Sequence, residues 1–517
     1  MLNLSVLLED TARNNPHRDA IVAEDRTLTY AQVDAATSQV AHLLVAHDIR
    51  PGDKVALSCP NLAWFPIIYY GILKAGAVVV PLNILLEDRE IAYHLDDSDA
   101  KAYFCYQGTP ELPIGDYARA GFDQAPNCRH LFIIDSPAPQ SGQTAGDLST
   151  AVRAQPTEFD ASPREAGDTA VILYTSGTTG KPKGAELTHA NMTLNAFTAN
   201  RQFGNSPARH DRHLVVLPLF HSFGQTVNMN AGFSVAATLV LQPRFDATTT
   251  LTLLHAEQIT LFAGVPTMYW GLLGALDDTV DLGRISAHLR LAVSGGAAMP
   301  VEIHTRFRQR FGVNILEGYG LSETSPLALF ADLDHEPRPG SIGRPVWGVQ
   351  VRLIDDECNT ITGNHAVGEI ALRGHNIMKG YHNRPDATNE VLRDGWFRTG
   401  DLAQRDTDGY FYIVDRAKDM IVRGGLNVYP REIEEILMTH EAVSLAAVVG
   451  IPHESHGEEI KAYIIPVPGT APTEDALIGW AKQQLAAYKY PRHIEFVRTL
   501  PMTATGKILK RELRTLG

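Results

Sequence analysis

The residues 174–189, rich in glycine, hydroxyl side chains and lysine, are the part of the chain best suited to chemistry. They read Tyr-Thr-Ser-Gly-Thr-Thr-Gly-Lys-Pro-Lys-Gly-Ala-Glu-Leu-Thr-His. The glycines let the backbone bend so that several N–H groups point to one centre, while the hydroxyl and ammonium groups add donors and positive charge. The residues that supply these groups are Thr175, Ser176, Gly177, Thr178, Thr179, Gly180, Lys181, Lys183 and Gly184. The stretch therefore predicts a phosphate-binding loop, with an ordinary solvated turn as the alternative.

The order of these residues excludes a Walker P-loop. A Walker loop needs Gly-Lys followed directly by Ser or Thr at the start of a helix. Here Lys181 is followed by Pro182 and Lys183 by Gly184, and Pro182 stops a helix at this point. The β-branched run 169–173 before the loop favours a buried strand that delivers the loop to the end of a sheet.

The composition is that of a globular protein with more than one domain. A chain of 517 residues exceeds the usual size of a single core. Its net charge of −14 argues against a nucleic-acid partner, so an anionic ligand needs a local positive site. The 4 cysteines form no C-x-x-C pair, which predicts neither a disulfide framework nor a zinc site and favours a reduced cytoplasm.

Neither apolar stretch near the N-terminus has the pattern of a targeting or membrane segment. Residues 1–10 lack a basic start and reach acidic residues after a few apolar ones, unlike a signal peptide. The stretch 65–86 is interrupted by Pro66, Lys74 and Pro81, which indicates protein core. We therefore expect no transmembrane segment and a cytoplasmic location. Peripheral association with a membrane stays open, although no basic amphipathic helix favours it.

The spacing of the apolar runs predicts an α/β protein in three parts. Residues 1–415 form the large N-terminal domain, 416–430 the hinge and linker, and 431–517 a small, mobile α+β domain. Buried-strand runs alternate with helical periods in the large domain, which predicts parallel-type sheets, and closely spaced strands from about 341 predict a β-rich subdomain. The strand candidates are 54–57, 77–80, 169–173, 214–217, 237–241, 261–263, 289–293, 313–316, 349–354, 367–373, 410–414, 443–449, 462–467 and 494–497.

Six motifs occur along the chain in a fixed order. They are Thr-Ser-Gly-Thr-Thr-Gly-Lys-Pro-Lys-Gly at 175–184, Gly-Tyr-Gly-Leu-Ser-Glu-Thr at 318–324, Trp-Phe-Arg-Thr-Gly-Asp at 396–401, Asp-Arg at 415–416 with Lys418, Gly-Gly-Leu-Asn-Val-Tyr-Pro at 424–430 and Pro-Met-Thr-Ala-Thr-Gly-Lys at 501–507. Together they resemble the adenylate-forming superfamily of acyl- and aryl-CoA synthetases, luciferases and adenylation domains, and most resemble a fatty-acid–CoA ligase. The resemblance covers essentially the whole chain. It implies that ATP activates a carboxylic acid as an acyl-AMP, from which the acyl group passes to coenzyme A.

The resemblance assigns the phosphates and the metal ion to two of these motifs. The loop would bind the β- and γ-phosphates through Thr175, Ser176, Gly177, Thr179 and Gly180, with Lys183 and Thr178 acting in catalysis. Glu323 would bind Mg²⁺ together with Thr178, since hard oxygen ligands beside phosphates suit that ion. A helix-capping or surface glutamate is the alternative for Glu323.

The resemblance also assigns the adenosine part of ATP. Tyr319 would stack on the adenine, and Thr324 would contact the α-phosphate. The slot for the base would be lined by Gly295, Gly296, Ala297 and Gly320. Asp401 would accept hydrogen bonds from the ribose hydroxyls and Arg416 would add a second contact, with a structural ion pair between Asp401 and Arg416 as a compatible alternative.

Lys507 lies in a basic run near the C-terminus, and its plain interpretation is a solvated helix face. The resemblance makes it the lysine that bridges the substrate carboxylate and the α-phosphate, so the small domain would have to close over the large one. This role needs only a fixed ammonium, and nothing in the sequence predicts a lowered pKa. The domain would then turn about Lys418, so that Gly424 and Gly425 line a channel for coenzyme A. A flexible turn is the alternative for Lys418.

The residues around His221 bear on the acid. The resemblance places His221 beside the acyl pocket, and a packed core histidine is the alternative. Neighbours that favour a hydrophobic acid are Phe220, Phe223, Phe262, Val265, Met268, Tyr269 and Trp270. In the superfamily that the chain resembles, adenylation domains for amino acids carry an aspartate near the position of His221. Malonyl-CoA synthetases carry an arginine in the segment that corresponds to 266–272. This chain has neither residue there.

A medium- or long-chain fatty acid is therefore the leading prediction, and an aryl or cinnamate-like acid is the next. Two further alternatives are an acyl-AMP ligase that serves a carrier protein or an amine, and a catalytically silent nucleotide-binding switch. A homodimer is left open.

Overall fold

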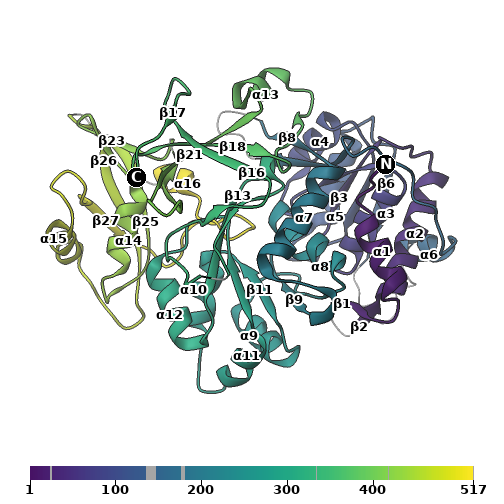
Figure 1. Cartoon of the computed structure of the whole chain (residues 1–517), viewed down its shortest axis with the longest axis horizontal. Helices are drawn as coiled ribbons and strands as arrows, with labels where there is room; N and C mark the ends of the chain where they lie inside the picture. The colour runs from purple at the N-terminus through teal and green to yellow at the C-terminus, as the bar shows by residue number, and fades with distance from the viewer. Residues whose placement is uncertain are drawn as a thin grey trace.

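The computed structural model describes residues 1–23, 26–135, 147–175, 181–333, 335–416, 418–453 and 455–515. Ser176, Gly177, Thr178, Thr179 and Gly180 of the predicted phosphate loop lie outside the described residues. Figure 1 shows the N-terminal part of the chain on the right and the C-terminal part on the left, with the middle of the chain between them.

The first sheet is mostly parallel and carries the predicted phosphate loop at one strand end. Its order is β19-β8-β7-β4-β3-β5-β6. The strands are β3 (Lys54–Ser58), β4 (Val78–Pro81), β5 (Ala100–Tyr106), β6 (His130–Ile134), β7 (Thr169–Thr175), β8 (Lys183–Thr188) and β19 (Gly380–Tyr381). β7 and β8 pair in antiparallel register, with Thr175 opposite Lys183. The predicted loop therefore joins two strands, where a Walker loop would open a helix, and β8 is a strand that the sequence reading did not include.

Some of the helices that accompany this sheet begin or end at recognisable capping signals. The helices are α1 (Val6–Asn14), α2 (Tyr30–Ala46), α3 (Trp64–Lys74), α4 (Asp88–Asp97), α5 (Ile114–Asp123), α6 (Asp147–Arg153) and α7 (His189–Phe203). Thr29 and Gln32 form a reciprocal capping box at the start of α2, and Thr188 and Asn191 form another at α7. Gly204 ends α7 in the left-handed conformation that glycine favours.

The second sheet is also parallel in its centre, and the strands at its two edges pair in antiparallel fashion. Its order is β15-β14-β13-β12-β11-β9-β10-β1-β2. The strands are β1 (Asp19–Ala23), β2 (Arg26–Thr29), β9 (Arg212–Val215), β10 (Thr238–Leu241), β11 (Leu261–Gly264), β12 (Leu291–Ser294), β13 (Ile315–Gly320), β14 (Leu327–Phe330) and β15 (Arg344–Pro345). The connecting helices are η1 (Pro207–Arg209), η2 (Phe223–Asn230), α8 (Ala231–Ser234), α9 (Ala247–Ala256), α10 (Pro266–Gly274), α11 (Leu282–His288), α12 (Val301–Phe311) and η3 (Ser322–Thr324). The parallel-type sheets predicted from the sequence are confirmed.

The third sheet is antiparallel and is the predicted β-rich part. Its order is β17-β16-β18-β21-β20, with β22 paired to β21. The elements are β16 (Val349–Ile354), β17 (Thr360–Ile361), β18 (Gly368–Gly374), α13 (Pro385–Val391), β20 (Leu392–Arg393), β21 (Trp396–Arg405) and β22 (Phe411–Arg416). Register places Asp401 of β21 opposite Arg416 of β22.

The fourth sheet builds the C-terminal part around a core of its own. Its order is β24-β23-β26-β25, with β27 paired to β26. The elements are β23 (Ile421–Arg423), β24 (Leu426–Val428), α14 (Pro430–Met438), β25 (Val443–His453), β26 (Gly457–Pro466), α15 (Glu474–Gln484), β27 (His493–Phe496) and α16 (Lys510–Thr515). Its buried apolar residues, from Ile421 to Leu513, form a cluster separate from that of the rest of the chain. We call residues 419–515 the small domain and those before 416 the large domain.

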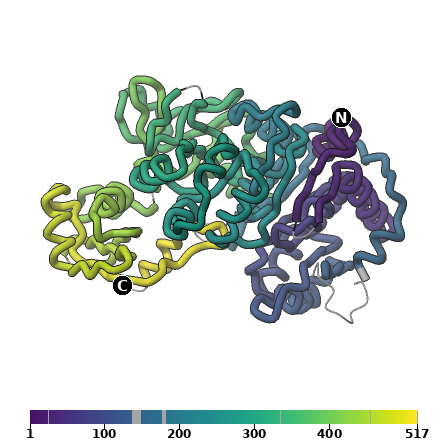
Figure 2. The backbone as a smooth tube through the Cα atoms, turned by 90° about the horizontal axis from the view of Figure 1, so that it is seen from below, coloured from purple at the N-terminus to yellow at the C-terminus, as the bar shows by residue number. Residues whose placement is uncertain are grey.

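A loop of the small domain before α16 reaches the large domain at Gly506, and α16 then packs back on the small domain. In Figure 2 the yellow tube runs from the small domain toward the teal centre of the molecule. The Thr267 hydroxyl of α10 donates a hydrogen bond to the Gly506 carbonyl, with 2.7 Å between the oxygens. The two domains therefore meet close to Lys507. Among the described residues, no helix is long and apolar enough to cross a membrane.

Candidate active site

A cavity of about 810 Å³ lies between the large domain and the end of the small one. It opens where β4, β7, β12 and β13 end, which is where parallel sheets carry their ligands. The described residues that were predicted for the site and line this cavity are Thr175, Lys183, His221, Gly295, Gly296, Tyr319, Gly320, Glu323, Asp401, Arg416, Lys418 and Lys507. The fold thus brings together residues more than three hundred positions apart. Ala297, Thr324, Gly424 and Gly425 are not among the described lining residues.

The ribose side of the predicted nucleotide site is an ordered set of side chains. Asp401 is buried and accepts a hydrogen bond from the Tyr319 hydroxyl, 2.7 Å from Oδ2. The Arg416 Nε lies 3.1 Å from its Oδ1. The ion pair considered from the sequence is therefore present, and it holds the carboxylate at the cavity wall, where its remaining lone pairs can accept from hydroxyl groups.

The glycines of this wall have different reasons to be glycine. A Cβ on Gly295 would lie 3.1 Å from the Phe223 ring, so the wall is tight at that point. A Cβ on Gly320 would lie 1.6 Å from the Pro326 carbonyl oxygen, so this position excludes a side chain whatever binds in the cavity. Gly296 has φ +80°, in the left-handed region that favours glycine.

Thr324 is buried and uses its hydroxyl inside the protein. The hydroxyl donates to the Pro326 carbonyl at 2.5 Å and accepts from the Leu321 N–H at 2.8 Å. It holds the turn that presents Glu323. A contact with the α-phosphate needs the hydroxyl to leave this network, and that role stays a prediction.

The phosphate side is built around Tyr381, which the sequence reading did not include. The Lys183 Nζ lies 4.7 Å from the centre of the Tyr381 ring, a cation–π contact. The Tyr381 hydroxyl donates to Glu323 Oε1 at 2.9 Å. Strand β19 carries Tyr381 and pairs with β8, so tertiary register brings it here and no local motif marks it. One ring therefore links the predicted phosphate lysine to the predicted metal ligand.

Two further observations concern the loop and the metal ion. The Tyr93 hydroxyl of α4 donates to the Pro182 carbonyl at 2.7 Å and fixes one end of the phosphate loop.

Glu323 is 8% exposed and lines the cavity, and no described residue donates a hydrogen bond to its Oε2. A carboxylate oxygen facing a phosphate site fits Mg²⁺, which prefers such ligands and keeps several waters.

Lys507 enters the cavity at the end of a tight turn. The turn is closed by the Lys507 N–H, which donates to the Thr503 hydroxyl at 3.1 Å, and by the Thr503 N–H, which donates to the Lys507 carbonyl at 2.8 Å. Burial, and after it the positive charge of Arg416, lowers the pKa of Lys507 from 10.5 to about 8. Nothing in the sequence indicated this lowered pKa, which arises because the fold places the ammonium in an enclosed site beside another cation.

His221 lies at the same cavity and is neutral at pH 7. Burial, and after it the Lys507 charge, lowers its pKa to about 4. Its Nδ1 accepts a hydrogen bond from the Phe223 N–H at 3.3 Å, so the ring proton sits on Nε2. A neutral N–H donor of this kind can orient a carboxylate without adding charge.

Apolar side chains line part of the cavity. Phe330 and Leu327 lie against Gly318, and Phe223 lies against Gly295. Of the aromatic and apolar neighbours predicted from the sequence, Phe220, Phe223 and Val265 line the cavity. Phe262, Met268, Tyr269 and Trp270 are not among its described lining residues. Closeness in sequence did not predict these positions, because Phe262 lies in β11, and Met268, Tyr269 and Trp270 lie on α10, with their side chains in other contacts. Apolar side chains that line the cavity and were not predicted include Phe203, Leu217, Val227, Leu327 and Phe330.

The predicted channel residues Gly424 and Gly425 form the turn between β23 and β24. Both have positive φ, 59° and 79°, so glycine suits the turn. The Gly424 N–H donates to the His456 carbonyl at 2.8 Å. A channel role for this turn, like the hinge role of Lys418, stays a prediction.

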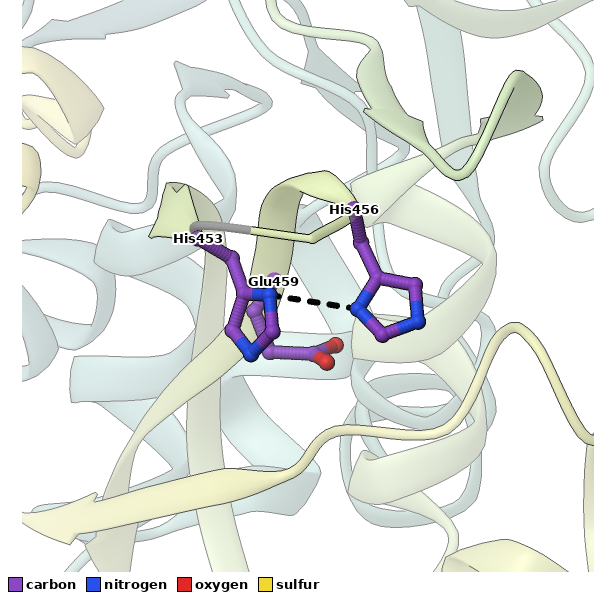
Figure 3. Close-up of side chains that lie close together, drawn as sticks. All are labelled: His453, His456 and Glu459. Atoms are coloured by element: carbon purple, nitrogen blue, oxygen red, sulfur yellow. Dashed lines mark hydrogen bonds between the residues drawn. The ribbon is translucent and has the colours of Figure 1, made fainter.

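Three possible metal ligands lie beside this turn on the β25–β26 hairpin, namely His453, His456 and Glu459 (Figure 3). The two Nδ1 atoms are 3.1 Å apart. Glu459 is already engaged, since its two carboxylate oxygens accept from Arg423 at 2.5 and 2.8 Å. We therefore assign the group to bracing the hairpin, and we assign no metal to it.

Comparison with known proteins agrees with the geometry. The family model of the AMP-binding enzymes matches residues 8–382, and that of the AMP-binding enzyme C-terminal domain matches residues 432–507. The chain therefore belongs to the AMP-binding enzyme family.

Several individual relatives indicate the type of reaction. The chain is 34% identical to a long-chain-fatty-acid–CoA ligase of Bacillus subtilis, over 99% of this chain and 94% of the relative. It is 37% identical to a feruloyl-CoA synthase of Amycolatopsis, over 97% and 96% of the two chains. The crystal structure of ATP-bound MatB from Rhodopseudomonas palustris superposes with a TM-score of 0.90 at 31% identity, over 100% of this chain and 99% of that one. These findings support an AMP-forming acid–CoA ligase and leave the acid open, because the relatives differ in it.

Proposed function

We propose that the protein activates a medium- or long-chain fatty acid as its acyl-AMP and transfers the acyl group to coenzyme A. The observation that carries this proposal is that Lys507, Lys183, Glu323 and Asp401 line one cavity together with apolar side chains that include Phe203, Leu217 and Phe220. The long-chain-fatty-acid–CoA ligase among the relatives supports the same class of acid.

In the first step a carboxylate oxygen of the acid attacks the α-phosphorus of ATP, and the bond to pyrophosphate breaks. The Lys507 ammonium lies between the two anions and offsets their repulsion, and the His221 Nε2–H orients the carboxylate. Lys183, on the platform of Tyr381, holds the leaving pyrophosphate together with the loop. Mg²⁺, when bound at Glu323, supplies charge neutralisation on the phosphates.

In the second step the coenzyme A thiol attacks the acyl carbonyl and AMP leaves. We propose that the large and small domains act as two bodies, with Lys418 as the hinge and with Gly424 and Gly425 beside the thiol channel. The boundaries predicted from the sequence are 1–415, 416–430 and 431–517, whereas β23 and β24 of the predicted linker belong to the sheet of the small domain. In this account Lys507 serves the first step and is withdrawn for the second. The proposed setting is the cytoplasm.

A second acid class is an aryl or cinnamate-like acid, and the feruloyl-CoA synthase among the relatives favours it. A coupled assay for AMP distinguishes the two classes. Hexanoate, dodecanoate, hexadecanoate, benzoate and ferulate are each supplied with ATP and Mg²⁺, with and without coenzyme A. We expect the largest kcat/KM with dodecanoate or hexadecanoate and thioester when coenzyme A is present. Preference for ferulate would overturn the fatty-acid assignment, and acyl-AMP that never becomes a thioester would overturn coenzyme A as acceptor.

A further inference from the structure

Helix α10 belongs to the large domain and carries two side chains that hold the small one. The Thr267 hydroxyl donates to the Gly506 carbonyl at 2.7 Å. One turn further along, the Trp270 Nε1–H donates to the Ser444 hydroxyl at 3.0 Å. The Trp270 ring also packs against the apolar core of the small domain. Both contacts cross between residues separated by more than 170 positions.

The Thr267 contact lies immediately before Lys507. Gly506 has φ +78°, and a Cβ on it would lie 2.9 Å from the Thr267 Oγ1 and 3.0 Å from the Val265 Cγ2. The loop therefore rests directly on the first turn of α10, with its backbone too close for any side chain between them. The peptide that carries Lys507 into the cavity is fixed from outside its own domain.

Helix α10 is itself firmly held, which makes it a suitable support. Pro266 occupies its first turn, where proline is favoured. The Tyr269 hydroxyl donates to the Val293 carbonyl of β12 at 2.7 Å and anchors the helix to the sheet. Val265, directly before the helix, lines the cavity. The wall of the cavity and the docking point of the small domain are thus parts of one segment, 265–270.

We propose that Thr267 and Trp270 are positioning residues, which dock the small domain in the orientation that puts Lys507 into the cavity. This inference rests on the proposed function, because it assigns both residues to formation of the acyl-AMP and neither to formation of the thioester. Neither residue is among the described residues that line the cavity. Each acts through the placement of Lys507.

The test compares the two half-reactions in the full-length protein. Acyl-AMP formation is measured as dodecanoate-dependent exchange of pyrophosphate into ATP without coenzyme A, and thioester formation is measured from preformed dodecanoyl-AMP. Thr267→Val keeps the shape and removes the hydroxyl, so we expect exchange to fall about 3- to 10-fold, the effect of one lost hydrogen bond, with thioester formation unchanged. Thr267→Ser keeps the hydroxyl and should restore exchange.

Two controls separate docking from a general loss of stability. Thr252→Val is a matched change, because the Thr252 hydroxyl bonds only within helix α9 and is exposed; it should alter neither step. Trp270→Phe and Ser444→Ala remove the two partners of one hydrogen bond, and Trp270→Phe also reduces packing against the small domain. The double variant should therefore be no slower in exchange than Trp270→Phe alone. Equal loss of both half-reactions in Thr267→Val, or no loss beyond that of Thr252→Val, would overturn the proposal.

A second measurement needs no substrate acid, so a failure of the docking proposal can be told from a failure of the proposed function. The rate at which acetic anhydride labels Lys507, followed by mass spectrometry, reports how well the loop is docked. We expect faster labelling in Thr267→Val than in the wild type. If the wild type activates no acid tested, the proposed function fails, and unchanged labelling of Lys507 would then also refute docking by Thr267.

Discussion

Replacing Lys507 with methionine should abolish acyl-AMP formation and at the same time stabilise the fold. The lysine pKa falls from 10.5 to about 8, because the folded protein disfavours the charged ammonium. At 1.36 kcal/mol per unit, a shift of this size corresponds to about 3 kcal/mol. The ammonium is partly open to the cavity, so we take that figure as an upper bound and expect about 1 to 3 kcal/mol at pH 7. Methionine keeps the length of the side chain and carries no charge.

The direction of the pKa shift determines how the gain in unfolding free energy depends on pH. A lysine with a lowered folded-state pKa costs stability fully below about pH 8, and the cost disappears as the pH rises toward the unfolded value of 10.5. The difference in unfolding free energy between Lys507→Met and the wild type should therefore be largest at pH 7 and shrink toward pH 10. Urea unfolding at several pH values, without substrates, measures it.

Lys510 supplies a control of opposite sign. It lies three positions further on, and its Nζ is 2.7 Å from Glu434 Oε1. The neighbouring carboxylates outweigh burial and raise its pKa. Lys510→Met should therefore destabilise the protein at pH 7. A Lys507→Met variant that is no more stable than the wild type, or a gain that does not shrink at high pH, would refute the electrostatic reasoning.

Three further predictions concern the same cavity. The kcat/KM for acyl-AMP formation should fall about tenfold per pH unit above pH 8 as free Lys507 loses its proton, and a pH profile that stays flat to pH 10 would contradict this. Tyr381→Phe removes the hydrogen bond to Glu323 and keeps the ring under Lys183. The Mg²⁺ concentration for half-maximal rate should therefore rise about tenfold, while the KM for ATP stays similar. An unchanged Mg²⁺ requirement would argue against Glu323 as the ligand. Gly320→Ala puts a methyl group 1.6 Å from the Pro326 carbonyl and should cost about 3 kcal/mol or more, which thermal unfolding measures; an unchanged melting temperature would show that the turn can move.

Local sequence patterns predicted much of the fold for identifiable physical reasons. The β-branched run 169–173 is strand β7, and the Thr29 capping box starts α2 as expected. Both signals are local, since a buried strand and a helix cap are each encoded within a few residues. Strand β8 was missed because Lys183 and Gly184 carry no strand pattern, and only pairing with β7 makes the segment extended.

Some residues of the candidate site were also predictable from local motifs, and others were not. Lys507, Glu323 and Asp401 stand in contiguous motifs, so the resemblance could point to them, and the fold places all three at the cavity. Tyr381 could not be predicted in this way, because strand pairing between β19 and β8 brings it to Glu323. The lowered pKa of Lys507 also depends on tertiary burial beside Arg416. Trp270 is a case in which the sequence pointed to the wrong place. It was predicted among the apolar neighbours of the acid, but in the structure its side chain contacts Ser444 of the small domain.

The transfer of a labelled oxygen tests the central claim most directly. Dodecanoate carrying ¹⁸O in both carboxylate positions is converted with ATP, Mg²⁺ and coenzyme A, and the products are analysed by mass spectrometry. If a carboxylate oxygen attacks the α-phosphorus in the cavity that Lys507 enters, AMP carries one ¹⁸O and pyrophosphate carries none, and Lys507→Met forms no labelled AMP. Label in inorganic phosphate or pyrophosphate, or unlabelled AMP alongside thioester, would contradict the account.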